Sequence, residues 1–311
     1  MAAKKSVPMS AFLKGWPRGR DQGESEPIRS ETADNAEAIR QYLASERIPF
    51  SHGYTEYKEG LILNILSDSG LMQRFRNGVA LPAGFGSRLD ERIVEYPWVF
   101  AHLPDDEGLI LDAGSTFNKA KLLASAPLAG RRILIYTLET DWITYDPRIS
   151  YVFGDLRDML LKDGIAETIV CISTLEHVGF TYDYKNYSKH KPWPFAQPDT
   201  YLQAVAEFRR VLVSGGTLLL TVPYGQYEDH GWLQQFDSDR IERVKKHFDG
   251  DVKSEAYYRY QDCAWVASSA DECAELCYFN IHETGHFEED GLAAARAVCC
   301  LELVKPQASS P

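Results

Sequence analysis

GLILDAGSTFN, residues Gly108 to Asn118, is the stretch of this chain that decides the fold. Its apolar run, residues 109–111, has the length and character of a buried parallel strand, and Asp112 follows it. The small residues Ala113, Gly114 and Ser115 then predict a turn where the backbone can approach a ligand closely. In open α/β sheets, ligands bind beyond the carboxyl ends of the strands. If the run is the first strand of such a sheet, the turn predicts a nucleotide-like cofactor.

From residue 108 onward, apolar strands alternate with helical patterns. We expect strands at 109–113, 132–138, 149–153, 168–173, 217–222, 252–260 and 297–304, and helices at 119–125, 200–212, 238–248 and 270–277. Ser269 and Glu272 have the spacing of a capping box for the last of these helices. The alternation predicts an α/β fold with a doubly wound, mostly parallel seven-stranded sheet.

The remaining sequence suggests how the chain is divided. Residues 1–48 are polar and interrupted by glycine and proline, so we expect a loosely ordered arm with one helix near 33–45. Residues 49–104 show helical spacing near 61–75 and 89–103, with Pro97 inside the second helix, and predict a helical lead-in or cap. A Rossmann-like domain would span 105–305, with an insert at 180–198 as a lid, and residues 306–311 would form a tail.

Composition narrows the class of protein. The chain has 311 residues, a net charge of −12 and a pI near 5.2. Because an acidic protein repels a phosphate backbone, we do not expect it to bind nucleic acid. Its apolar runs fall short of the roughly 20 residues that span a bilayer, and we expect a cytoplasmic protein without a membrane span. The six cysteines lack zinc spacing and are expected to be free buried thiols. No spacing in the sequence demands a metal, so none is assigned, but a site where Glu176, His177, Asp229 and His230 converge stays open.

Polar or small residues end four of the predicted strands. The first strand ends in Asp112, the second near Thr137 and Glu139, the third in Gly154-Asp155-Leu156, and the fourth in Ser173-Thr174-Leu175-Glu176-His177. Because parallel strands deliver their carboxyl ends to one edge of a sheet, we expect these groups to converge on one ligand site.

The order of these segments resembles that of class I S-adenosylmethionine-dependent methyltransferases. The resemblance rests on LDAGS, an acidic residue after the second strand, GDLRD, CISTLEHVG and LRRVLVSGGTLLLTVP, over residues 108–223 and more loosely to 304. It implies S-adenosyl-L-methionine as the cofactor. On this resemblance Asp112, Gly114 and Ser115 match the first motif, whose backbone lies against the methionine part of the cofactor. Ser173, with Thr174, would lie near the sulfonium.

The same resemblance assigns the nucleoside side. Glu139 is the candidate for the acidic residue that binds the ribose diol, with Thr137 as the alternative holder of that position. A carboxylate suits this role because it can accept two hydrogen bonds from adjacent hydroxyls. Asp155 would accept a hydrogen bond from the adenine amino group, and Leu156 would lie beside the ring.

The first motif also departs from the family pattern. Thr116 and Asn118 stand where members of the family usually have further glycines. Threonine does not tolerate a left-handed backbone, so the loop must follow a different path or bind the cofactor differently. These positions are the main support for an alternative, a non-catalytic binding or scaffold protein with this fold. A dinucleotide-dependent oxidoreductase is less favoured, because STFNKA follows Gly114 in place of the glycines of G-x-G-x-x-G.

The acceptor side has two candidate general bases. Similar Leu-Glu-His-Val segments in the family place Glu176 and His177 beside the transferred methyl group, although His177 could instead pack under the cofactor. His230, backed by Asp229, is the second candidate, since the ordinary pKa of histidine lies near working pH. Further candidate acceptor-binding residues, which could equally serve packing, are Tyr224, Trp232 and Arg259.

The sequence thus predicts methyl transfer to a hydroxyl group of a small molecule or glycan precursor, with a histidine as the general base. The glycan preference rests on a looser likeness to bacterial methyltransferases of surface-polysaccharide pathways. The acceptor itself, the acceptor atom and the oligomeric state stay open.

Overall fold

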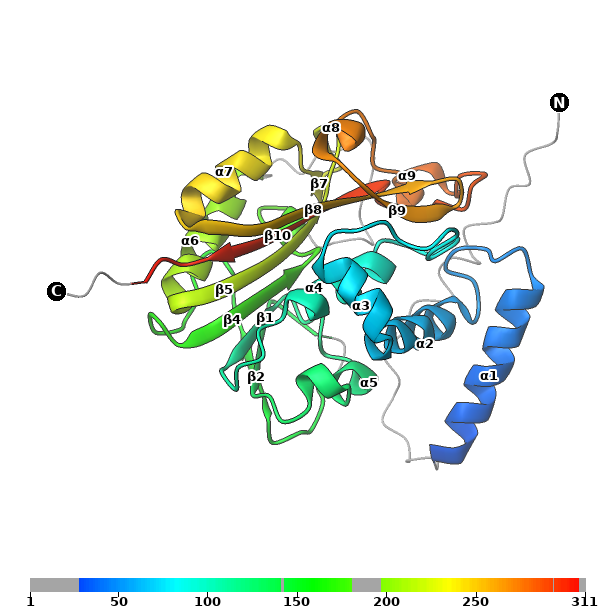
Figure 1. Cartoon of the computed structure of the whole chain (residues 1–311), viewed down its shortest axis with the longest axis horizontal. Coiled ribbons are helices and arrows are strands. Elements are labelled where there is room, and N and C mark those ends of the chain that lie inside the picture. The colour runs from blue at the N-terminus through cyan, green and yellow to red at the C-terminus, as the bar shows by residue number, and fades with distance from the viewer. Residues whose placement is uncertain (1–27, 141–142, 181–196, 293, 308–311) are drawn as a thin grey trace.

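The structure is a computed structural model, and it describes residues 28–140, 143–180, 197–292 and 294–307. An eight-stranded sheet has the order β3-β2-β1-β4-β5-β10-β8-β9 (Figure 1). Its strands are β1 Ile110–Ala113, β2 Ile133–Thr137, β3 Ile149–Phe153, β4 Ala166–Ile172, β5 Leu212–Pro223, β8 Asp251–Gln261, β9 Ala264–Ser268 and β10 Ala297–Val304. Strands β6 Glu228–Asp229 and β7 Gln234–Gln235 form a separate two-stranded ribbon.

The strand directions confirm the predicted fold class. Strands β1 to β5 pair in parallel, with β1 between β2 and β4, while β10 runs antiparallel to both β5 and β8. This is the mostly parallel, doubly wound arrangement of the class I methyltransferase-like fold. The strand order reverses at β1, so the switch point where such sheets bind ligands lies beside the loop after β1.

The eighth strand, β9, was not predicted. It pairs antiparallel with β8 through a two-residue turn at Asp262 and Cys263, which have φ angles of 52° and 60°. Two positive φ values match a type I′ hairpin turn, whose usual sequence signal is Asn-Gly or Asp-Gly. Asp-Cys hides that signal, because cysteine rarely adopts a left-handed backbone.

Helices cover both faces of the sheet (Figure 1). The first face packs against α2 Tyr54–Ser67, α3 Ser69–Arg76, α4 Arg92–His102 and α5 Ala120–Leu123, with α1 Ile28–Ala44 outside them. The second face packs against α6 Tyr201–Val211, α7 Ser238–Phe248 and α8 Ala270–Cys273. The remaining short helices are α9 Ile281–Thr284 and the 3-10 turns η2 Ala126–Leu128, η3 Leu175–His177 and η4 Pro198–Thr200.

Several predicted helix limits shift in the structure. The helical pattern over 61–75 forms two helices, because the Asp68 carboxylate accepts hydrogen bonds from Gly70 N and Leu71 N and starts a new helix. The capping box of Ser269 and Glu272 is confirmed, but its helix ends at Cys273 instead of 277. In the part of the chain that the structure describes, none of the helices is long and apolar enough to cross a membrane.

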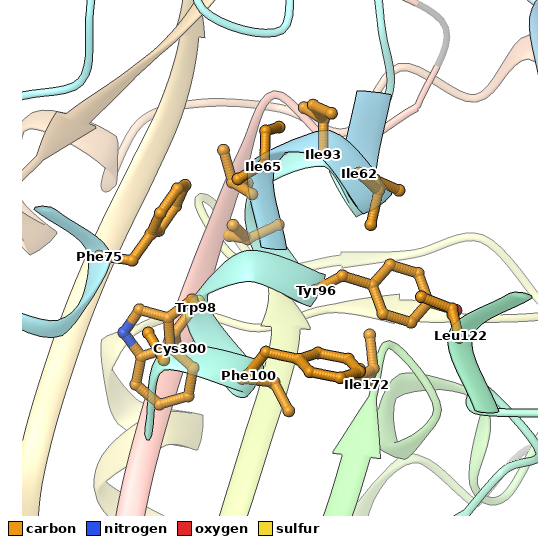
Figure 2. Close-up of a cluster of buried hydrophobic side chains, with 14 of the residues drawn as sticks. Ile62, Ile65, Phe75, Ile93, Tyr96, Trp98, Phe100, Leu122, Ile172 and Cys300 are labelled. Carbon is orange, nitrogen blue, oxygen red and sulfur yellow. The ribbon is translucent and has the colours of Figure 1, made fainter. Parts of the chain in front are cut away.

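Helix α4 is the element that joins the N-terminal helices to the sheet. It contains Pro97, and its side chains Trp98 and Phe100 are buried. Figure 2 shows these two rings over the sheet near Cys300 of β10 and Ile172 of β4. From the same helix, Tyr96 Oη donates a hydrogen bond of 2.7 Å to Thr116 O. Helix α4 therefore reaches the loop after β1.

Candidate functional site

Asp112 organises the loop after β1. Its carboxylate is fully buried and accepts hydrogen bonds from Thr116 N at 3.0 Å, Thr116 Oγ1 at 2.9 Å and Phe117 N at 2.7 Å. Burial raises the pKa of Asp112 to about 6, while these three donors oppose the increase. The side chain that matches the first motif is thus used to fix the backbone of the loop.

Gly114 has no room for a side chain. Its φ is +115°, and a Cβ atom at this position would lie 2.1 Å from Thr174 Oγ1 at the end of β4. The loops after β1 and β4 therefore meet at backbone distance, as expected at a switch point. Ser115 also has a positive φ, 65°, whereas Thr116 and Asn118 do not. Glycine is consequently not required at 116 or 118, and the departure from the family pattern has a local explanation.

Asn118 links the loop after β1 to the loop after β2 and to strand β3. Its Nδ2 donates to Thr140 Oγ1 at 3.0 Å, and its Oδ1 accepts from Thr144 Oγ1 at 3.1 Å and from Tyr151 Oη at 2.8 Å. Thr140 and Thr144 follow β2, and Tyr151 belongs to β3. An asparagine therefore supplies hydrogen bonds here that a glycine could not.

The nucleoside-side candidates lie at the ends of β2 and β3. Thr137 is buried and donates its hydroxyl hydrogen to Glu139 O at 2.8 Å, while the Glu139 side chain is exposed. The Asp155 carboxylate forms a two-pronged ion pair with Arg157, 2.6 Å at its shortest, and these hydrogen bonds lower its pKa. Leu156 is buried beside it. A carboxylate has about four acceptor positions, so the ion pair leaves capacity for a further donor.

Ser173 at the end of β4 uses its hydroxyl hydrogen within the protein. Its Oγ donates to Glu95 Oε1 at 2.6 Å, and its backbone has a φ of 36°. The same Glu95 oxygen accepts from Thr221 Oγ1 at 2.7 Å, and Glu95 Oε2 pairs with Arg92 Nη1 at 2.6 Å. Towards the sulfonium predicted nearby, Ser173 can offer only acceptor groups, because its hydroxyl hydrogen is engaged.

His177 has a defined tautomer in the η3 turn. Its Nδ1 lies 2.9 Å from Trp232 O, and since a carbonyl only accepts, Nδ1 carries the hydrogen and Nε2 is unprotonated. Nε2 lies 3.9 Å from Glu176 Oε1. Burial lowers the pKa of His177 to about 4 and raises that of Glu176 well above its ordinary value. The pair therefore holds a neutral imidazole at neutral pH.

The predicted pairing of His230 with Asp229 is wrong. Consecutive side chains of a strand point to opposite faces, so Glu228 and His230 share a face and Asp229 lies on the other. His230 Nε2 lies 3.6 Å from Glu228 Oε2, while Asp229 is exposed and accepts a hydrogen bond from Gly231 N at 2.8 Å. A carboxylate does accompany His230, but it is Glu228.

The other acceptor-side candidates differ in their surroundings. The Trp232 ring lies 5.3 Å from the His177 ring, so Trp232 belongs to the same group. Tyr224 is 1% exposed and packs on Tyr257 in the core between sheet and helices. Arg259 Nη2 lies 3.9 Å from Glu272 Oε1 of α8. These contacts give Tyr224 and Arg259 packing roles, and acceptor binding by either residue stays a prediction. The predicted lid at 180–198 also stays a prediction, because most of it lies outside the described residues.

The contribution of helix α4 to the candidate site was not predicted from the sequence. The residues Glu91, Arg92, Glu95 and Glu176, which we call the acidic cluster, influence one another electrostatically beside the ends of β4 and β5. Glu95 is fully buried, and it stands within the otherwise apolar run IVEYPWVF. A charged residue inside such a run was the available signal, since buried charges require partners.

A surface cavity of about 460 Å³ lies away from these strand ends, near the start of β5. Its cationic side chains are already engaged. Arg210 binds Glu207 and Asp163, and Lys305 Nζ donates to Leu212 O at 2.6 Å. These contacts make it a packing feature at the amino ends of the strands. Throughout the described ranges, no group of three or more His, Cys, Asp or Glu side chains could hold a metal ion.

Comparisons with known proteins give similarity at the level of the fold. No family model and no curated protein matches the chain. The [4+2]-cyclase SpnF shares 13% identity, covering 81% of this chain and 96% of its own, with a TM-score of 0.45. A Burkholderia thailandensis 1,6-didemethyltoxoflavin-N1-methyltransferase, solved with S-adenosylhomocysteine, shares 11% over 93% and 94%, with a TM-score of 0.41. A Mesorhizobium loti S-adenosylmethionine-dependent methyltransferase shares 11% over 68% and 97%, with a TM-score of 0.43.

Proposed function

We propose that this chain is an S-adenosylmethionine-dependent methyltransferase that acts on a hydroxyl group of a small molecule or glycan precursor. One observation carries the proposal. Gly114, in a loop held by the buried Asp112, meets Thr174 at the switch point of the sheet, two residues before Glu176. Gly114 and Ser115 are partly exposed, so their backbone could face a ligand at the point where a nucleotide cofactor and an acceptor would meet.

The residues at the strand ends fit the proposed cofactor. The backbone of Gly114 and Ser115 would lie against its methionine part, and the exposed Glu139 would accept from the ribose hydroxyls. Asp155 and Leu156 would receive the adenine ring. When bound, the cofactor supplies a methyl group on a positively charged sulfur. Alignment of this group with the acceptor could contribute several kcal/mol through proximity alone.

His177 is the first candidate for the general base. Burial holds it neutral, with Nε2 unprotonated, so that it can take the proton of an acceptor hydroxyl at neutral pH. His230 beside Glu228 is the second candidate. The non-catalytic alternative loses much of its support, because Thr116 and Asn118 need no glycine in this loop.

Calorimetry with S-adenosylmethionine, S-adenosylhomocysteine and NAD tests the proposal. We expect saturable binding of both sulfur nucleotides and none of NAD. If neither sulfur nucleotide binds, the methyltransferase proposal fails. Glu139→Ala and Asp155→Ala then test the nucleoside side, with Asp229→Ala as a control because its carboxylate caps an exposed turn. Unchanged affinity in either test variant removes that residue from the site.

A further inference from the structure

The acidic cluster contains more carboxyl groups than its single arginine can pair with. Arg92 Nη1 pairs with Glu95 Oε2 at 2.6 Å, and this pair is neutral as a whole. Glu91 and Glu176 are then left over, with no lysine or arginine of the described residues within ion-pair distance. The neighbouring Asp90 does not change this count, because Lys58 neutralises it.

Both of the remaining carboxyl groups are buried and incompletely bonded. Glu91 is 9% exposed and Glu176 is 2% exposed. The Oε2 atom of each has no hydrogen-bond partner among the residues that the structure describes. Burying such an oxygen without a partner costs free energy, and native proteins rarely leave it so. Two buried carboxyl groups in one cluster therefore call for a partner that is not among the described residues.

Aromatic rings stand beside these carboxyl groups. Burial raises the pKa of Tyr278, and the nearby charges of Glu91 and Glu176 raise it further. The Tyr278 ring lies 6.5 Å from that of Trp232 in an edge-to-face arrangement, and 5.2 Å from that of His230. Aromatic faces combined with carboxylates attract ammonium groups, because both present negative charge to the cation.

We propose that the acceptor carries an ammonium group, bound by the carboxylates of Glu91 and Glu176 against the ring of Tyr278. The acceptor class is then an amino alcohol or an amino sugar, in which the ammonium group anchors the molecule and a hydroxyl receives the methyl group. An anionic acceptor would be repelled by the same carboxylates. This inference rests on the proposed function, because it names the substrate class of the same site.

Binding of the ammonium group should release a proton from the acidic cluster. Burial, with help from the charges of Asp90 and Glu95, raises the pKa of Glu91 to about 8, and burial also raises the pKa of Glu176 well above its ordinary value, so the empty site holds at least one proton at neutral pH. A bound cation favours the ionised carboxylate and expels this proton. The groups that face this region from the surrounding elements are Tyr54, Lys58, Asp90, Arg92, Glu95, Glu176 and Tyr278. Ammonium affinity should therefore increase between pH 6.5 and 8.5.

Ethanolamine and its uncharged isostere propan-1-ol test the inference. Both would be titrated by calorimetry into the full chain, with and without S-adenosylhomocysteine. We expect ethanolamine to bind at least tenfold more tightly, with proton release visible in buffers of different ionisation enthalpy. Glu176→Gln should weaken ethanolamine binding at least tenfold and leave the affinity for S-adenosylhomocysteine within threefold. The exposed Glu242→Gln in α7 should change neither.

The outcomes separate this inference from the proposed function. Equal binding of ethanolamine and propan-1-ol, or ethanolamine affinity unchanged in Glu176→Gln, overturns the ammonium site even if S-adenosylhomocysteine binds. Ethanolamine binding without any sulfur nucleotide binding overturns the methyltransferase proposal and leaves only a cation site. If Glu176→Gln does not fold, Glu91→Gln and the comparison of the two ligands on the wild-type chain still decide the question.

Discussion

Glu95 Oε1 accepts a hydrogen bond of 2.6 Å from Ser173 Oγ, and this contact ties helix α4 to the carboxyl end of β4. Because the same oxygen also accepts from Thr221 Oγ1, one buried carboxylate joins the helix to two neighbouring strands. Residues that precede the sheet in sequence thereby shape the proposed acceptor site.

Replacing Glu95 should reveal how much this junction contributes to stability. Glu95→Ala leaves Arg92 and two buried hydroxyls without their acceptor, so we expect a loss of about 3 kcal/mol in the free energy of unfolding. Glu95→Gln should lose less, because it keeps an acceptor for the hydroxyls. Urea denaturation measures both. Glu37→Ala in α1 breaks an exposed ion pair that solvent screens, so it should have a much smaller effect. Similar losses for Glu95→Ala and Glu37→Ala would contradict the junction.

The close approach of the loops after β1 and β4 predicts that Gly114 tolerates no side chain. In Gly114→Ala the new Cβ would lie 2.1 Å from Thr174 Oγ1, so the loop must move and S-adenosylhomocysteine affinity should fall at least tenfold. Gly130→Ala is the matched control, because Gly130 also has a positive φ but nothing within 4 Å of its Cβ position. Calorimetry on both variants separates the clash from backbone strain. Equal retention of affinity would remove the Gly114 loop from the site.

The strands of the sheet could be predicted well because buried parallel strands appear in the sequence as short apolar runs. The run that ends at Asp112 and the strand 297–304 both appear where expected. The prediction failed where local signals were absent. Strand β9 follows an Asp-Cys turn, and the acidic cluster unites α4 with η3 across about 80 residues of sequence. No spacing rule connects such distant positions.

Glu91 should make stability depend on pH. Its pKa is raised from the ordinary value of 4.5 to about 8, so the folded protein keeps a proton that the unfolded chain loses in this range. Its contribution is therefore full below about pH 4.5 and is lost as the pH increases to about 8. Glu91→Gln should be more stable than the wild type at pH 8, by on the order of a few kcal/mol, and similar at pH 5. Urea denaturation at pH 5, 6.5 and 8 measures the difference. A constant difference across this range would contradict the assignment.

His177 should remain neutral wherever the protein is folded near neutral pH. Its pKa is lowered to about 4 by burial, and Nδ1 donates its hydrogen to Trp232 O. Long-range ¹H–¹⁵N spectra of the imidazole should therefore show the Nδ1–H tautomer, unchanged between pH 5.5 and 8. The exposed His247 of α7 serves as a reference ring in the same spectra. If His177 titrates within this range, it carries a charge for part of it, and the assignment of a neutral base fails. If the tautomer is as expected, His177→Gln should lower the rate of methyl transfer by about 10²- to 10⁴-fold, as loss of a general base does. Unchanged affinity for S-adenosylhomocysteine in this variant would place the loss in the proton-transfer step and leave cofactor binding intact.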